Sequence, residues 1–137
     1  MSLLDTLTSP AGLRRVLAFD AIAGGATGVL HLGLAGPLSG LLGLPAALLQ
    51  GTGVAIFAFV SLAAWLAMQA APPRAALTTL ALGNFAWVIG CVAVGFGAAP
   101  AITPWGMTYA LMQAVVVLVL AELQWMAPRR QRPALLA

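Results

Sequence analysis

The sequence predicts an all-α, polytopic membrane protein, a bundle of four transmembrane helices with both termini in the cytoplasm. Hydrophobic residues make up 62% of the 137 residues and charged residues only 7%, a composition outside the range of soluble globular proteins. The apolar residues run on without the alternation that marks a strand. All six positively charged residues are arginines, and they fall on one side of the predicted bilayer.

The predicted spans form one transmembrane domain over residues 1–137. Each is long enough to cross a bilayer core of about 30 Å as a helix. Ser9 is a capping residue and Pro10 suits a first helical position, so the first helix is expected to begin near Pro10. Residues 1–8 are mildly amphipathic and are expected to lie at the membrane surface as an interfacial turn. Prolines in "PLSGLLGLP", "APPR" and "APAITP" predict connections there, which leaves spans at 13–36, 46–70, 76–98 and 104–127.

The arginines give the orientation. They lie at the start of the first span, between the second and third spans and after the fourth, whereas the other two connections carry no charge. Because positively charged loops stay in the cytoplasm, both termini are expected there. The arginines form no basic face with interleaved aromatic residues, so nucleic acid is not an expected partner. They are Arg14, Arg15, Arg74, Arg129, Arg130 and Arg132.

Two acids lie inside the spans, and an intramembrane acid is a functional candidate by default. Counted from the nearest arginines, Asp20 and Glu122 both lie roughly 9–10 Å inside the cytoplasmic boundary. One interpretation makes them structural locks that pair with arginines or take up a proton. The other makes them part of a ligand- or proton-binding site. If the two acids are neighbours, repulsion should keep one of them protonated, as a coupled carrier requires.

Three more polar residues complete the set of candidate ligand- or proton-binding residues. Asn84 and Gln113 both fall near the bilayer midplane, where they are expected as hydrogen-bond partners. His31 lies nearer the outer face, and at 100° per residue it points within about 20° of Asp20. Gly24 and Gly28 share that stripe and allow another helix to approach closely, so the stripe is expected to face protein.

His31 has several possible ligands. With Cys91, Met107 or Met112 it would suit a soft ion such as copper(I), and two copies of His31 in a dimer could hold haem. Thr27, four residues before His31, resembles the small residue that precedes the pigment-binding histidine of light-harvesting peptides. The simpler interpretation is a histidine that hydrogen-bonds Thr27 or a loop. The sequence requires no cofactor, and its single cysteine excludes an internal disulfide or a structural zinc cluster.

The last two spans carry polar residues on defined faces. Asn84, Trp87 and Cys91 form one face of the third span, which is expected to be a core stripe. In the fourth span, Glu122 falls on a face with Thr108, Met112, Val115 and Trp125, whereas Gln113 falls roughly opposite, with Tyr109 and Gln124. Two polar faces on one helix favour a homo-oligomer or a partner membrane subunit.

No enzyme motif is present, so catalysis is not expected. In "LRRVLAFDA", "NFAWVIG" and "AELQW" the chain resembles the small four-span membrane proteins common in bacteria of high genomic GC content. That resemblance implies a four-helix bundle in a bacterial inner membrane and no particular activity. Small multidrug transporters are a more distant analogy, which shares four short spans and an acid in the first but lacks the one-sided arginines.

Two functional interpretations follow from the sequence. The first is a small accessory or binding subunit with a polar stripe inside the bundle. The alternative is a proton- or cation-coupled carrier of small molecules that uses Asp20 and Glu122. A haem-, copper- or pigment-binding protein based on His31 ranks below both.

Overall fold

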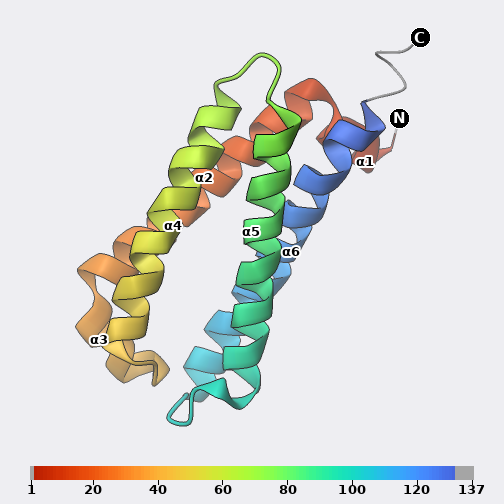
Figure 1. The fold of residues 1–137 in the computed structure, drawn as a ribbon. Helices are drawn as coiled ribbons and strands as arrows, with labels where there is room; N and C mark the ends of the chain where they lie inside the picture. Colours follow the sequence, from red (N-terminus) through yellow and green to blue (C-terminus); the bar gives the residue numbers. More distant parts are fainter. Residues whose placement is uncertain (1, 132–137) are drawn as a thin grey trace.

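The computed structural model describes residues 2–131, so Arg132 of the predicted orientation signal lies outside the described residues. Those residues form six α-helices and one π-helical turn and contain no strand (Figure 1). In chain order the elements are α1 (Leu3–Thr8), α2 (Pro10–Gly33), α3 (Ala35–Leu42), α4 (Ala46–Ala67), α5 (Arg74–Ala93), η1 (Val94–Ala98) and α6 (Pro104–Arg130).

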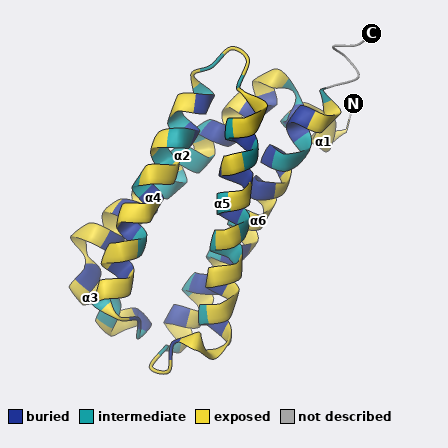
Figure 2. Cartoon of the chain, in the orientation of Figure 1, coloured by how far each residue is buried: buried dark blue, intermediate teal, exposed yellow. Residues whose placement is uncertain are grey.

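Four helical segments are long and apolar enough to cross a membrane, which confirms the predicted candidate spans and supports a multi-pass membrane protein. They are α2, α4, α6 and the segment Arg74–Ala98, in which the backbone departs from helical geometry at Phe96 and Gly97. Many of their large apolar side chains point outward, where Figure 2 shows mostly exposed residues. Ile22, Ile89 and Val115 are each at least 65% exposed. An apolar outer surface of this kind suits contact with lipid rather than water.

The two longest helices begin in the same way. Ser9 caps α2 by accepting a hydrogen bond from the Gly12 N–H at 3.1 Å, and Pro10 is the first helical residue, as predicted. Thr103 caps α6 by accepting from the Gly106 N–H at 3.1 Å, and Pro104 follows. A hydroxyl cap supplies an acceptor to the first turn, and proline there lacks an N–H that would have no partner within the helix.

Two prolines behave differently from the prediction. The segment "PLSGLLGLP" was expected to be a connection, but only residues 43–45 connect two helices, and residues 37–42 belong to α3, in which Pro37 is the third residue. The first-turn N–H groups have no partner within a helix, so proline is tolerated there. Likewise α6 was expected to end at 127 but continues through Pro128 to Arg130. Pro128 lies so near the helix end that it interrupts only the last turn.

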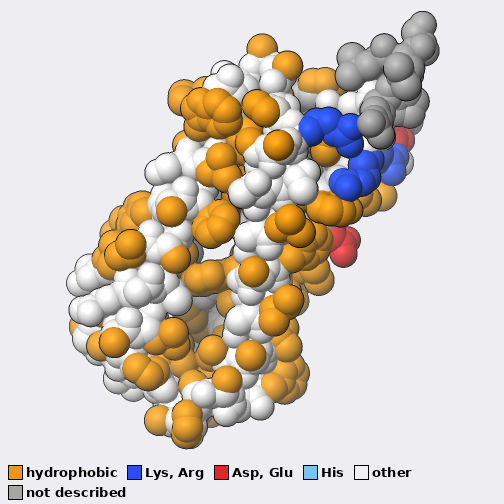
Figure 3. Space-filling model, viewed as in Figure 1, with side chains coloured by type: hydrophobic (Ala, Val, Ile, Leu, Met, Phe, Trp, Pro, Cys, Tyr) orange, Lys and Arg blue, Asp and Glu red, His pale blue; other side chains and the backbone are white. Residues whose placement is uncertain are grey.

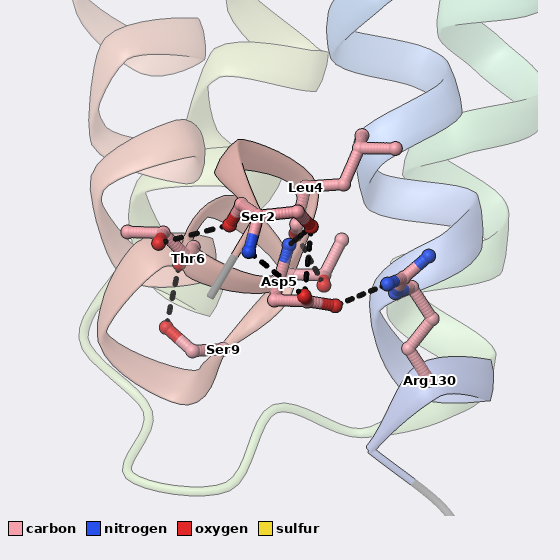
Figure 4. Close-up of polar contacts among 7 residues, drawn as sticks. Ser2, Leu4, Asp5, Thr6, Ser9 and Arg130 are labelled. Carbon is pink, nitrogen blue, oxygen red and sulfur yellow. Dashed lines mark hydrogen bonds and ion pairs between the residues drawn. The ribbon is translucent and has the colours of Figure 1, made fainter.

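The N-terminal segment, predicted as an interfacial turn, is the short helix α1 (Figure 4). Ser2 and Asp5 form a reciprocal capping box, in which Ser2 Oγ accepts from the Asp5 N–H and the Asp5 carboxylate accepts from the Ser2 N–H. Asp5 also forms an ion pair with Arg130, and the Gln131 amide donates to the Thr8 carbonyl at 2.7 Å. These contacts hold α1 against the end of α6.

The long helices form two pairs, α2 with α4 and α5 with α6 (Figure 1). In the first pair, Gly24 lies against Val60 and Gly28 against the ring of Phe57, close enough that an added Cβ would stand 2.8 Å from each side chain. The glycine stripe of α2 thus contacts α4. Contacts between the two pairs are fewer than contacts within them.

The two pairs join at both ends of the bundle. At the arginine end, a buried apolar cluster takes side chains from all four long helices: Leu13, Leu17, Ala63, Leu66, Leu77, Leu80 and Ala127. At the other end, Thr103 donates from its N–H to the Leu42 carbonyl at 3.0 Å and from its hydroxyl to the Leu41 carbonyl at 2.7 Å. The pairs are therefore joined at both ends of the bundle, and the space between them lies midway along it.

Candidate functional site

Two amide side chains, one from α5 and one from α6, meet at Asp20 of α2. The amide of Asn84 donates to Asp20 Oδ2 at 2.9 Å, and the amide of Gln124 donates to the same oxygen at 2.5 Å. Asn84 also donates to Gln124 Oε1 at 2.9 Å, which closes the ring of contacts. The cluster joins α2 to α5 and α6, and Gln124 is completely buried. Burying polar groups in an apolar bundle is tolerated because each one satisfies another.

The second carboxylate oxygen of Asp20 is left available. Both amides bind Oδ2, and Oδ1 accepts no hydrogen bond from a described residue. No buried side-chain nitrogen or oxygen among residues 2–131 lacks a partner, so Oδ1 must be accessible. Asp20 lines a cavity of about 260 Å³ between the two helix pairs, together with Asn84, Thr27, Trp87 and Gln113. Aliphatic and aromatic side chains form most of the remaining wall.

His31 bridges the two helix pairs farther from the arginine end. Its Nδ1 lies 3.0 Å from Thr52 Oγ1, and its Nε2 lies 2.7 Å from the Tyr109 hydroxyl. Because the Thr52 hydroxyl donates to backbone carbonyls of α4, it can only accept from the Nδ1–H. Nε2 then accepts the proton of the Tyr109 hydroxyl. This arrangement fits a neutral imidazole with both nitrogens engaged.

A second cavity, of about 360 Å³, lies beside His31. It is lined by Tyr109, Thr52 and Cys91 and by apolar side chains of α4 and α5. Phe59, Gly83, Trp87 and Gln113 border both cavities. The ring of Phe59 lies directly on Gly83, and the Trp87 indole N–H donates to Gln113 Oε1 at 3.3 Å. These contacts separate the space near Asp20 from the space near His31. Between α4 and α5 the molecular surface is hollowed (Figure 3).

The structure does not bring Glu122 to Asp20. Glu122 is exposed on the outer face of α6, whereas the α6 residue that contacts Asp20 is Gln124. Nor does Asp20 pair with an arginine, since the ion pair recorded within residues 2–131 joins Arg130 to Asp5. The expected hydrogen bond between Asn84 and Gln113 is also absent, because Asn84 binds the Asp20 cluster and Gln113 binds Trp87.

The metal candidates are only partly assembled. His31 and Cys91 line the same cavity, whereas Met112 is 58% exposed and borders the cavity of Asp20. Within residues 2–131, no group of three or more His, Cys, Asp or Glu side chains is placed to hold a metal ion. His31 binds Thr52 and Tyr109 instead of the expected Thr27, whose hydroxyl donates to the Ala23 carbonyl at 2.9 Å. A metal, haem or pigment would have to displace one of these partners.

Sequence reasoning overlooked three residues of the site: Gln124, Thr52 and Tyr109. The contact between Asp20 and Asn84 was predictable from their positions. Each lies ten residues after the first residue of its helix, so both stand about 15 Å from the helix start. A signal for Gln124 was also present. Helical phase already grouped Gln124 with Tyr109 and Gln113, and all three face the other helix pair. Thr52 gives no such signal, because a threonine hydroxyl within a helix can bond a backbone carbonyl of the same helix, as Thr52 does with Leu48.

Comparisons with protein-family models, with curated proteins and with solved structures found no match.

Proposed function

We propose that this chain is an integral membrane protein that binds a small ligand. The expected ligand is a largely apolar molecule with one basic or hydrogen-bond-donating group. The single observation that carries the proposal is the arrangement of Asp20. Two amides hold one carboxylate oxygen in place, and the other oxygen is accessible beside a mostly apolar cavity between two helix pairs. A mostly apolar pocket with a few fixed polar groups is the usual form of a small-molecule site.

The binding test uses 1-aminoadamantane, an apolar cage with one ammonium group, and its neutral analogue 1-adamantanol. Calorimetric titration of the purified protein should detect the amine. Asp20→Asn should weaken amine binding by tenfold or more, about 1.4 kcal/mol. The asparagine oxygen can still accept from Asn84 and Gln124, so this variant keeps the cluster. Glu122→Gln removes an acid that lines neither cavity and should leave binding unchanged. Equal binding by the wild type and Asp20→Asn would reject the proposal.

A proton- or cation-coupled carrier is the second candidate function. It is favoured by the two adjoining cavities, which follow one another along the bundle between the helix pairs and share Phe59 and Gln113 as borders. In proteoliposomes with an imposed pH gradient, a carrier would accumulate 1-aminoadamantane beyond its passive distribution, and Asp20→Asn would abolish the excess. If the amine binds in detergent but is not accumulated under a pH gradient, the function is ligand binding and not transport.

Orientation and location are part of the same proposal. The described arginines lie at the start of α2, the start of α5 and the end of α6, which is one end of the bundle (Figure 3). The positive-inside rule then puts this end, with both termini, in the cytoplasm. The resemblance to small four-span proteins of bacteria suggests an inner membrane.

We also propose a homo-oligomer or a partner subunit that covers the face of α6 carrying Glu122. This acid is exposed within a candidate span, and acids in spans are costly when they face lipid. Met112 and Val115 lie exposed on the same face. Cysteine crosslinking through Glu122→Cys, in a Cys91→Ser background, should give a covalent dimer if a second copy covers this face. A monomer alone would point to a different subunit.

A further inference from the structure

A third cavity lies at the arginine end, apart from the Asp20 and His31 cavities. Its volume is about 310 Å³, and it is bounded by α2, α4, α5, the connection before α5 and the end of α6. Two arginines from different helix pairs line it, Arg14 of α2 and Arg74 of α5. Leu13, Leu66 and Leu77 form part of its apolar floor.

Both guanidinium groups are available for a ligand. Neither Arg14 nor Arg74 forms an ion pair or a hydrogen bond with another residue of the described chain. Arg129 and Arg130, by contrast, bind the Trp125 carbonyl and Asp5. The Gln69 and Gln131 side chains that also line the cavity donate to backbone carbonyls, so they do not compensate the arginine charge. The cavity therefore contains two positive charges and no acid.

The start of α5 adds to this positive potential. Its N-cap is Pro73, which offers no side-chain cap, so the N–H groups of the first turn have no acceptor from the capping residue. The first turn of a helix carries partial positive charge and readily binds phosphate. Pro72 and Arg74, which flank this cap, both line the cavity.

We propose that this cavity binds a phosphate group, with Arg14 and Arg74 as the two cationic ligands. Guanidinium matches the oxygens of phosphate through paired N–H donors and stays charged in apolar surroundings. The cavity opens at the end of the membrane helices and has an apolar floor, which is the setting of a phospholipid headgroup and the start of its acyl chains. The phosphodiester of an anionic lipid such as phosphatidylglycerol is therefore the expected source, and inorganic phosphate is the other.

The experiment measures the thermal unfolding midpoint of the full-length protein in three settings. These are nanodiscs of phosphatidylcholine, nanodiscs with added phosphatidylglycerol, and phosphatidylcholine nanodiscs with inorganic phosphate in the buffer. A ligand that binds the folded state raises the midpoint. Phosphatidylglycerol should raise the wild-type midpoint by several degrees over phosphatidylcholine. Arg14→Gln and Arg74→Gln should each lose most of that increase.

Arg15→Gln is the matched control. Arg15 is adjacent to Arg14, is exposed as Arg14 and Arg74 are, and carries the same charge, but it lines none of the described cavities. Its variant should keep the wild-type increase. An increase with inorganic phosphate that depends on Arg14 and Arg74 would support the site and assign it to the soluble anion. Equal losses in all three variants would mean general charge attraction and overturn the proposal, as would no increase from either source.

Discussion

At the scale of single residues, Asp20 shows how a carboxylate can be retained inside an apolar bundle. Its partners are amides rather than arginines, so the carboxylate is held by hydrogen bonds without a nearby opposite charge. An arginine partner would have satisfied both oxygens through a paired contact. Two amides on one oxygen leave the other accessible to the cavity, so Asp20 both joins three helices and remains a candidate for ligand binding.

Gln124 should be the stabilising member of this cluster. In Gln124→Met the side chain keeps nearly the same length but neither donates to Asp20 nor accepts from Asn84. We expect a loss of about 1–2 kcal/mol of unfolding free energy in detergent, the range for buried polar groups deprived of partners between membrane helices. Glu122→Met, two residues away on the exposed face, should leave stability unchanged or increased. Equal losses in the two variants would contradict the assignment of α6 faces.

At the scale of helices, α1 depends on a charge at the bundle end. Hydrogen bonds from the Ser2 side chain and backbone, then from Arg130, lower the pKa of Asp5 from 3.8 to about 2. A pKa that is lower in the docked state means that the carboxylate contributes fully above pH 3.8. The contribution is lost as the pH falls through about 2.

Hydrogen exchange of the α1 amides, corrected for the intrinsic rate at each pH, tests this dependence. Protection of α1 relative to α5 should be constant near neutral pH and should fall as the pH approaches 2. Asp5→Asn should show reduced α1 protection already at neutral pH and little further change in acid. If α1 protection in the wild type does not fall relative to α5, the Arg130 contact does not hold the helix.

The close packing of α2 on α4 gives a second prediction for the helices. In Gly28→Leu the new side chain would enter the space filled by the Phe57 ring, so we expect the variant to lose about 1–3 kcal/mol of stability, the usual cost of overpacking. Gly25 has no neighbour within 4 Å of an added Cβ, so Gly25→Leu is the control and should be close to neutral. The measurement is the thermal unfolding midpoint of each variant in detergent. Equal decreases in Gly28→Leu and Gly25→Leu would show that α2 does not pack through the Gly28 face.

The helices were predictable because composition and proline positions determine them locally, as the starts at Pro10 and Pro104 show. The contacts of the site residues were less predictable from the sequence. Helical phase gives the face of a residue within its own helix but not the rotation of that helix toward its neighbours. Glu122 and Gln124 therefore remained alternatives for Asp20, and charge favoured the wrong one. Counting Asp20 from Arg14 rather than from the helix start at Pro10 also put it at a different level from Asn84, which it contacts.

At the scale of the whole molecule, two helix pairs are joined at their ends and leave cavities between them. In lipid there is no hydrophobic gain from pressing helices together, so packing and hydrogen bonds decide where they touch. The apolar cluster with Leu66 and Leu80 closes one end, and the contact of Thr103 with α3 closes the other. The polar contacts of Asp20 and His31 connect the pairs between these ends.

The orientation of the whole molecule is predicted by its arginines. Reporter fusions after Pro45 and Pro100 should report an external location, and fusions after Pro73 and at Ala137 a cytoplasmic one. Ala137 itself lies outside the described residues. An external signal after Pro73 would reverse the orientation and put the Arg14 and Arg74 cavity in the wrong leaflet.

The ring of Phe59 on Gly83 also sets a time scale. Phe59 is 37% exposed and its ring is attached to the helix through two rotatable bonds, so its reorientation is a side-chain movement. Rotations of such side chains take picoseconds to nanoseconds, whereas shifts of packed helices take microseconds to milliseconds. If a molecule moved from the Asp20 side to the His31 side, as the proposed carrier requires, the Phe59 ring and the Trp87–Gln113 contact would both have to open. Both are side-chain contacts, which belong to the faster of these two time scales.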